Sequence, residues 1–133
     1  MIVAMHVATG AAAGAVAGSR TEAALTGLAL HAVGDAIPHE DFDSLRFETI
    51  SGLGLLALLA TRRGVFDPAV IGGAFCAAPD LEHVIPHPGH ENPKLFPSHR
   101  LDGWHREGRI SAPTQLLAAL VIVGVLVLRK KER

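Results

Sequence analysis

The sequence has few cysteines, few aromatic residues and no excess of charge of either sign. Its 133 residues include one cysteine, one tryptophan and no tyrosine. The single Cys76 excludes an intramolecular disulfide and a cysteine-based zinc site. The formal net charge of -1 provides no basic field, so no nucleic-acid partner is expected. The scarcity of aromatic residues also leaves almost no aromatic belt of the kind found at membrane interfaces.

Apolar residues, 49% of the chain, occur in blocks that predict an all-α protein. Five apolar segments are separated by polar or turn-forming residues, and they cover about 3–18, 22–37, 49–61, 68–83 and 111–128. Ser19-Arg20-Thr21 offers an N-cap for the second segment, and Pro38 stops it. Pro68 is a favoured first-turn residue for the fourth.

The apolar segments also predict helices that cross a membrane. The segment 111–128 would reach roughly 27 Å at about 1.5 Å per residue, close to a hydrocarbon core of about 30 Å. The first two segments reach only about 24 Å, and would need local thinning or protein cover. We therefore expect residues 1–133 to form a single helical membrane domain, a small polytopic bundle of about four to five helices. A helical bundle with one C-terminal anchor is the alternative.

Basic residues near the segment ends predict the orientation of such a bundle. Arg20, the pair Arg62 and Arg63, and the basic C-terminal tail 129–133 fall on one side if the segments alternate in direction. The positive-inside rule makes that side cytoplasmic. The polar, His-rich loop 86–109 before the last segment would then lie on the extracytoplasmic side, together with the other histidines.

Glycine recurs every four residues in the first segment, at Gly10, Gly14 and Gly18. On a helix this spacing predicts a smooth face that lets a neighbouring backbone approach closely. A flexible Ala/Gly-rich leader is the alternative. We prefer the helix because alanine, the best helix former, occupies nearly every other position.

Histidine and carboxylate residues gather at one end of the alternating segments. His31 and Asp35 form an HxxxD pair whose side chains share one helix face. Asp35 could bind a metal together with His31 or orient that histidine, and simple solvation of the helix end is the alternative. His6 becomes a candidate ligand because segments that alternate in direction would bring it to the same end as His31 and Asp35. His39 could be a ligand or a polar helix terminus.

A second polar cluster, Pro79-Asp80-Leu81-Glu82-His83, closes the fourth segment. Asp80 and His83 are three residues apart and would lie on one helix face. Glu82 points elsewhere if the helix continues, so it could be a general base, or a ligand if the backbone turns. An ordinary turn or helix cap is the alternative for the Pro-Asp pair.

A third cluster, with His99 and His105, lies in the polar loop. Arg100 could hold an anionic group through two hydrogen bonds, and Trp104 could seat the loop at a membrane surface. The remaining two histidines of the loop, which we expect to be solvated, are His87 and His90.

These clusters supply more candidate metal ligands than one ion needs. The candidates are His6, His31, Asp35, Asp80, His83, His99 and His105. Imidazole and carboxylate suit zinc and related divalent ions, and a catalytic zinc uses three protein ligands and a water. The number of candidates therefore predicts two ions that share a bridge. Such a pair would stabilise the entering and leaving oxygens of a phosphoester.

These motifs resemble those of the YdjM-like family, bacterial membrane-bound metal-dependent hydrolases similar in ligand pattern to zinc-dependent phospholipase C. His6 matches the early histidine of the family, and segment 79–83 matches its Pro-Asp-x-Asp-His motif with glutamate for the second aspartate. His99-Arg100 followed by His105 resembles its His-Arg-Gly-x-Thr-His motif, but lacks the glycine and threonine and is one residue longer. The HxxxD pair is also present, although it precedes the Pro-Asp motif here.

The resemblance implies an integral protein of the bacterial inner membrane with a divalent-metal site. We expect a hydrolase at the membrane surface, where metal-activated water attacks an ester or phosphoester, with bilayer lipid as partner or substrate. Glu82 is the candidate catalytic base and Arg100 the candidate anion clamp. The alternatives are a non-catalytic metal-binding membrane protein and a structural small membrane protein whose histidines are interfacial.

Overall fold

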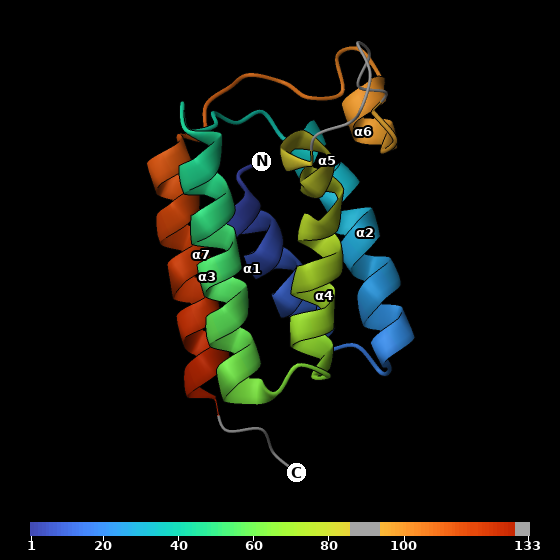
Figure 1. Ribbon diagram of the computed structural model, residues 1–133, viewed down its shortest axis with the longest axis vertical. Coiled ribbons are helices and arrows are strands. Elements are labelled where there is room, and N and C mark those ends of the chain that lie inside the picture. The colour runs from blue at the N-terminus through green and yellow to red at the C-terminus, as the bar shows by residue number, and fades with distance from the viewer. Residues whose placement is uncertain (86–93, 130–133) are drawn as a thin grey trace.

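The computed structural model describes residues 1–85 and 94–129, which form helices packed side by side (Figure 1). In chain order they are α1 (Val3–Gly14), α2 (Arg20–Ala36), α3 (Leu45–Arg63), α4 (Pro68–Ala77), η1 (Ala78–Asp80), α5 (Leu81–Val84), α6 (Pro97–Arg100) and α7 (Ala112–Leu128). No β-strand occurs in these ranges, so the all-α prediction is confirmed for them. His87, His90 and the basic tail 130–133 lie outside the described residues.

Side-chain caps fix the starts of four of the longer helices. Ser19, Ser44, Asp67 and Ser111 each accept a hydrogen bond from a backbone N–H in the first turn that follows. These oxygens satisfy N–H groups that have no partner within the helix. At its other end α2 stops at Ala36, because the residue before Pro38 is held in an extended conformation.

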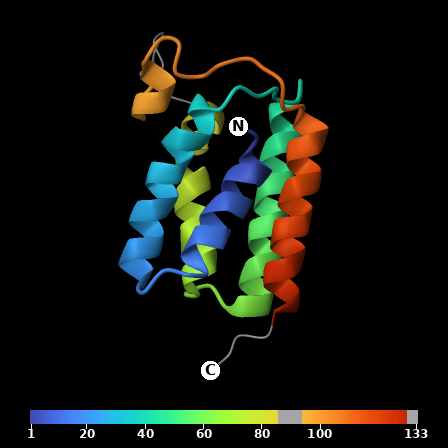
Figure 2. The ribbon, with the colours of Figure 1, turned by 180° about the vertical axis from the view of Figure 1, so that it is seen from behind.

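Helix α1 occupies the centre of the bundle, with α2, α3, α4 and α7 around it (Figures 1 and 2). Its alanines Ala4, Ala8 and Ala11 are completely buried and belong to the hydrophobic core. Small side chains suit this position, because they let the surrounding helices approach the backbone of α1 closely.

The glycine face of α1 packs against α4. A Cβ atom on Gly14 would lie 2.2 Å from the carbonyl oxygen of Pro68, closer than real Cβ contacts allow. Gly10 makes an equally close contact with α4. Gly18 lies beyond the end of α1, near Glu22, so the predicted smooth face consists of the first two glycines of the repeat.

None of the described helices combines the length and apolar character that a bilayer crossing requires. α1 has 12 residues and α4 has 10, about 18 and 15 Å at about 1.5 Å per residue. α7 is apolar but has 17 residues, and the 19 residues of α3 include Glu48 and end in two arginines. The prediction of a polytopic bundle in the bacterial inner membrane, with its His-rich face extracytoplasmic, is therefore wrong.

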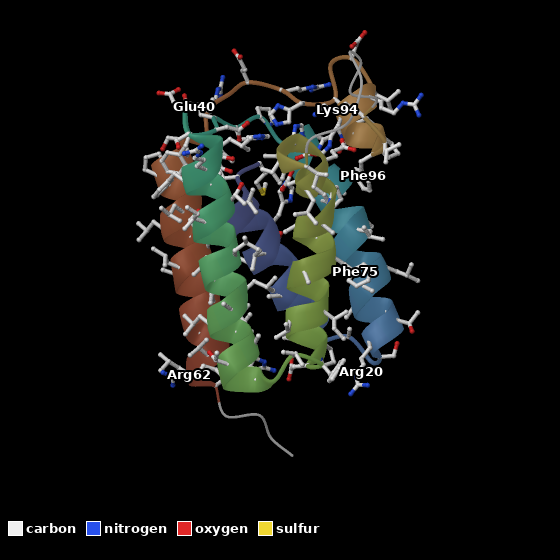
Figure 3. The ribbon with its side chains drawn as sticks, viewed as in Figure 1. Arg20, Glu40, Arg62, Phe75, Lys94 and Phe96 are labelled. Carbon is white, nitrogen blue, oxygen red and sulfur yellow. The ribbon has the colours of Figure 1, made fainter. Side chains whose placement is uncertain are left out.

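Polar segments gather at one end of the bundle, at the top of Figure 1. The N-terminus, the end of α2, the start of α3, α5 and α6 lie there, and the connection from α6 to α7 crosses over this end. The turns that precede α2 and α4 lie at the opposite end, where Arg20 and Arg62 are seen in Figure 3. The helix directions therefore bring histidines from distant parts of the chain to a common end.

Candidate metal centre

Asp35, near the C-terminal end of α2, is the carboxylate at which three histidines from different helices meet. Its Oδ1 lies 3.1 Å from Nε2 of His6 in α1. Its Oδ2 lies 3.0 Å from Nε2 of His31, one turn earlier in α2, and 3.3 Å from Nε2 of His99 in α6. The Ser98 hydroxyl donates a hydrogen bond of 2.6 Å to Oδ2. We call the following residues the central cluster: His6, His31, Asp35, Asp80 and His99.

The central cluster is withdrawn from solvent. His6 and His31 are completely buried, and Asp35 is 1% exposed. Burial acts against the charge on Asp35, but its close polar contacts with His31, His6, His99 and Ser98 hold the pKa of its carboxyl well below the usual range. Burial lowers the pKa of His6 to about 3, so this ring stays neutral. An anionic carboxylate and a neutral imidazole are the protonation states that bind metal ions.

The Nδ1 atoms of His31 and His99 both form hydrogen bonds. Nδ1 of His31 donates to the carbonyl oxygen of Cys76 at 2.8 Å, and Nδ1 of His99 donates to Oε1 of Glu82. When both rings are neutral, the Nε2 atoms present lone pairs, and these two atoms are 3.1 Å apart. Burial acts to lower the pKa of His99, but hydrogen bonds with Asp35 and Glu82 raise it, so an ion that binds His99 must displace a proton. Two ligands about 2.1 Å from one ion, at 90–110° to each other, are about 3.0–3.4 Å apart. A metal ion, or protons shared with Asp35, can fill this space.

Asp80, at the end of η1, adds a second carboxylate to the central cluster. Its Oδ1 lies 3.8 Å from Nε2 of His99, and its buried Oδ2 has no hydrogen-bond partner in the described part of the chain. Burial raises the pKa of this carboxyl to about 7. Ligand atoms of His6, His31 and Asp80 lie within 4.8 Å of one another, as do those of His31, Asp35 and His99. These groups could hold a metal ion, which would compensate the unpartnered oxygen.

Glu82, predicted as a catalytic base, is occupied by other contacts. Oε2 accepts hydrogen bonds from the backbone N–H groups of Leu95, at 2.8 Å, and Phe96, at 3.2 Å, and Oε1 pairs with His99. Burial acts to raise the pKa of Glu82, but these bonds bring it below its usual value. A carboxylate in this position orients a metal-binding histidine and fixes its tautomer.

The other predicted site residues lie around the central cluster. His83 is exposed, with Nδ1 2.7 Å from Nζ of Lys94, yet its ligand atoms can approach those of Asp80 and His99. Arg100 is exposed on α6 and is absent from the residues that line the cavity beside the cluster. His105 lies apart from the central cluster, next to His39.

A cavity of about 540 Å³ opens beside the central cluster. Its lining includes six carboxylates, from Asp35, Asp41, Asp43, Glu48, Asp80 and Asp102. His83, His99 and His105 also line it, as does the N-terminal ammonium of Met1, which lies 3.2 Å from Oδ1 of Asp35, whereas no lysine or arginine does among the described residues. The carboxylates outnumber this ammonium, so the cavity attracts cations.

Three contributors were not predicted from the sequence. Ser98 donates to Asp35, and Asp41 lines the cavity. Phe96 packs edge-on against the ring of His31, with centroids 4.9 Å apart, and marks this part of the molecule in Figure 3. Ser98 directly precedes His99 and Phe96 lies three residues before it, so proximity to a motif was the available signal. Asp41 lies in the acidic stretch 39–43, which carries no recognised motif.

No protein-family model, curated protein or solved structure matches this chain. The resemblance to the YdjM-like hydrolases therefore stays a prediction from the motifs. The functional argument depends on the arrangement of the residues themselves.

Proposed function

We propose that the protein is a metal-dependent hydrolase whose central cluster binds a divalent cation, with zinc as the first candidate. The proposal is carried by the approach of Nε2 of His31 to Nε2 of His99, with each Nδ1 proton held by another acceptor. Two imidazoles and a carboxylate are a common set of protein ligands for catalytic zinc.

In this proposal each residue of the cluster has a distinct task. His31, Asp35 and His99 bind the ion, and Glu82 holds the His99 ring in the binding orientation. Asp80 is the further carboxylate ligand, because its Oδ2 is buried without a partner. When bound, such an ion supplies Lewis acidity that lowers the pKa of water and polarises an ester oxygen.

An apolar groove supports an ester with a hydrocarbon chain as the substrate. The groove has a volume of about 320 Å³ and lies between α1, α3 and α4, with Leu53, Ala74 and Phe75 in its lining. Val3 and Asp80 line both the groove and the acidic cavity, so the two are neighbours. Apolar pockets with a few polar groups at one point are typical of small-molecule sites. An acyl chain in the groove would bring its ester group toward the central cluster.

Metal content tests the binding part of the proposal. Asp35→Asn should lose about one equivalent of zinc per chain, measured by elemental analysis after dialysis, because one anionic ligand is removed. Asp43→Asn is the matched control, since Asp43 lines the same cavity but lies outside the central cluster. Circular dichroism reports whether each variant is folded. Equal zinc in folded Asp35→Asn and in the unchanged protein would refute the assignment.

Ester hydrolysis tests the catalytic part. We expect chelator-sensitive hydrolysis of nitrophenyl esters that becomes faster as the acyl chain lengthens. Ala74→Trp should abolish the preference for long chains by filling the groove, whereas Ala57→Trp, on the exposed face of α3, should keep it. Stoichiometric zinc without turnover of any carboxyl or phosphoryl ester would favour a non-catalytic metal-binding protein instead.

A further inference from the structure

We infer that His39, Asp41 and His105 form a second binding site for a divalent transition-metal ion such as zinc, separate from the central cluster. We call these three residues the rim triad. The site does not depend on the proposed hydrolase activity. One role suggested below, the recognition of an anionic substrate, does rest on the proposed function.

The ligand atoms of the rim triad point at a common position. Nε2 of His39 lies 3.0 Å from Nε2 of His105 and 3.3 Å from Oδ1 of Asp41, while Nε2 of His105 lies 3.5 Å from Oδ2 of Asp41. The two rings meet edge to face, at 78°, so stacking does not explain their approach. The N-terminal ammonium of Met1 also reaches this position, where it contacts Nε2 of His39 and lies 3.9 Å from Oδ1 of Asp41, so the position already favours a cation. One ion can contact all three groups.

His39 is oriented as a buried metal ligand would be. Its side chain is fully buried, and its Nδ1 donates a hydrogen bond of 2.6 Å to the carbonyl oxygen of Ile37. In the neutral ring the Nε2 lone pair therefore faces His105, Asp41 and the N-terminal amino group of Met1, which a bound ion would displace. His31 in the central cluster is held in the same way, with its Nδ1 bonded to a backbone carbonyl oxygen.

Backbone hydrogen bonds, and not the triad itself, hold the two halves of the site together. The N–H of His39 donates to the carbonyl oxygen of Arg106 at 3.1 Å, and the N–H of Gly108 donates to the carbonyl oxygen of His39 at 3.1 Å. The N–H of Glu40 donates to the carbonyl oxygen of Ile110 at 2.9 Å. The indole N–H of Trp104, next to His105, donates to the carbonyl oxygen of Ala32 in α2 at 2.8 Å. The backbone thus places the ligands before any ion binds, which lowers the cost of binding.

The charge of the cavity explains what a second ion would add. Asp41 and His105 line the same cavity as Asp35 and Asp80, and that cavity has six carboxylates in its lining. One divalent ion in the central cluster would leave it negative, and a phosphoester would be repelled. A second ion at the rim triad would reduce this repulsion, and both ions could contact the oxygens of an anionic substrate.

Zinc stoichiometry tests the second site directly. We would titrate the purified protein with zinc against a chromophoric chelator and expect two equivalents for the unchanged chain. Asp41→Asn and His105→Ala should each remove one equivalent, while Asp102→Asn, which alters another carboxylate of the cavity lining, should keep both. Asp41 and His105 are exposed, so these variants should remain folded.

The variants separate failure of the rim triad from failure of the proposed function. If the protein binds one zinc that only Asp35→Asn removes, the rim triad is refuted and the central cluster stands. If only His105→Ala removes it, the rim triad stands and the metal centre of the proposed function fails. As a further check, His105→Ala should slow phosphodiester hydrolysis by about tenfold or more and affect neutral carboxyl esters far less.

Discussion

Gly10 in α1 and Gly72 in α4 lie backbone to backbone. A Cβ atom added to Gly10 would be 2.3 Å from the carbonyl oxygen of Gly72, and one added to Gly72 would be 2.3 Å from that of Gly10. Cys76, whose carbonyl oxygen orients His31, follows one turn later in α4. The contact between α1 and α4 thus fixes both the packing of the bundle and one wall of the central cluster.

Gly10→Ala should therefore destabilise the protein by about 2–4 kcal/mol, because backbone atoms cannot move aside as a flexible side chain can. Gly54→Ala in the exposed face of α3 is the matched control, since a Cβ there meets nothing within 4 Å. It should stabilise the fold by up to about 1 kcal/mol through helix propensity. Urea unfolding followed by circular dichroism measures both, and similar effects of the two substitutions would contradict the close contact.

Gln115 should be the most sensitive polar position in α7. Its buried side chain accepts a hydrogen bond from the N–H of Ile2 at 3.1 Å and donates to the carbonyl oxygens of Glu40 at 2.7 Å and Ile110 at 3.2 Å. Gln115→Leu removes these three hydrogen bonds and should cost about 2–4 kcal/mol, although the carbonyl oxygen of Ile110 still accepts from the N–H of Glu40. Leu117→Ala, at an exposed position of the same helix, should cost much less. A loss below about 1 kcal/mol in Gln115→Leu would show that the N–H of Ile2 and the carbonyl oxygen of Glu40 find other partners.

Glu82→Gln should weaken zinc binding without removing a ligand. The substitution replaces the carboxylate that holds Nδ1 of His99, and loss of such an orienting group typically lowers metal affinity by about 10–100-fold. Competition with a chelator of known affinity measures the change, with Glu22→Gln at the far end of α2 as control. An unchanged affinity would mean that Glu82 does not orient His99. The sequence-based prediction that Glu82 is a catalytic base would then be the better explanation.

Glu48 should make stability depend on pH. Burial, reinforced by the charge of Asp41, raises the pKa of Glu48 above 4.5, while a hydrogen bond from the N–H of Phe42 acts against this shift. A raised carboxyl pKa means that the folded state binds the proton more tightly, so stability falls as pH rises from 4.5 through the folded pKa.

Glu48→Gln removes this titration, and its stability relative to the unchanged protein should therefore increase between pH 4 and pH 7. Urea unfolding at a series of pH values, with chelator present throughout, measures the difference. Glu40→Gln, at an exposed position, should give no such trend. A constant difference between Glu48→Gln and the unchanged protein would contradict the pKa shift.

Much of the helical architecture could be predicted from local chemistry, whereas the environment of the helices could not. Ser19, Pro38 and Pro68 predicted helix ends correctly, because caps and prolines act within one turn. The apolar blocks were taken as membrane helices, since a short buried helix and a membrane helix share the same composition. Only the packed structure reveals that α1 is short and covered on all sides by other helices.

The candidate site was predictable where two ligands share one helix, and less so where backbone pairing brings them together. His31 and Asp35 are four residues apart in α2, so their contact followed from helix geometry. His39 and His105 meet because residues 39–40 hydrogen-bond to 106–110 across a long separation in sequence. No local pattern signals such pairing, and Asp41 was therefore not recognised as their partner.

The central position of α1 has a consequence for synthesis of the chain. Every residue of the central cluster leaves the ribosome before α7 does, because α7, which completes the cover of α1, consists of residues 112–128. We expect a nascent chain that still lacks α7 to carry the ion-binding residues already, with one side of its innermost helix open to water. Zinc captured at that moment would hold the growing bundle together until the last helix arrives.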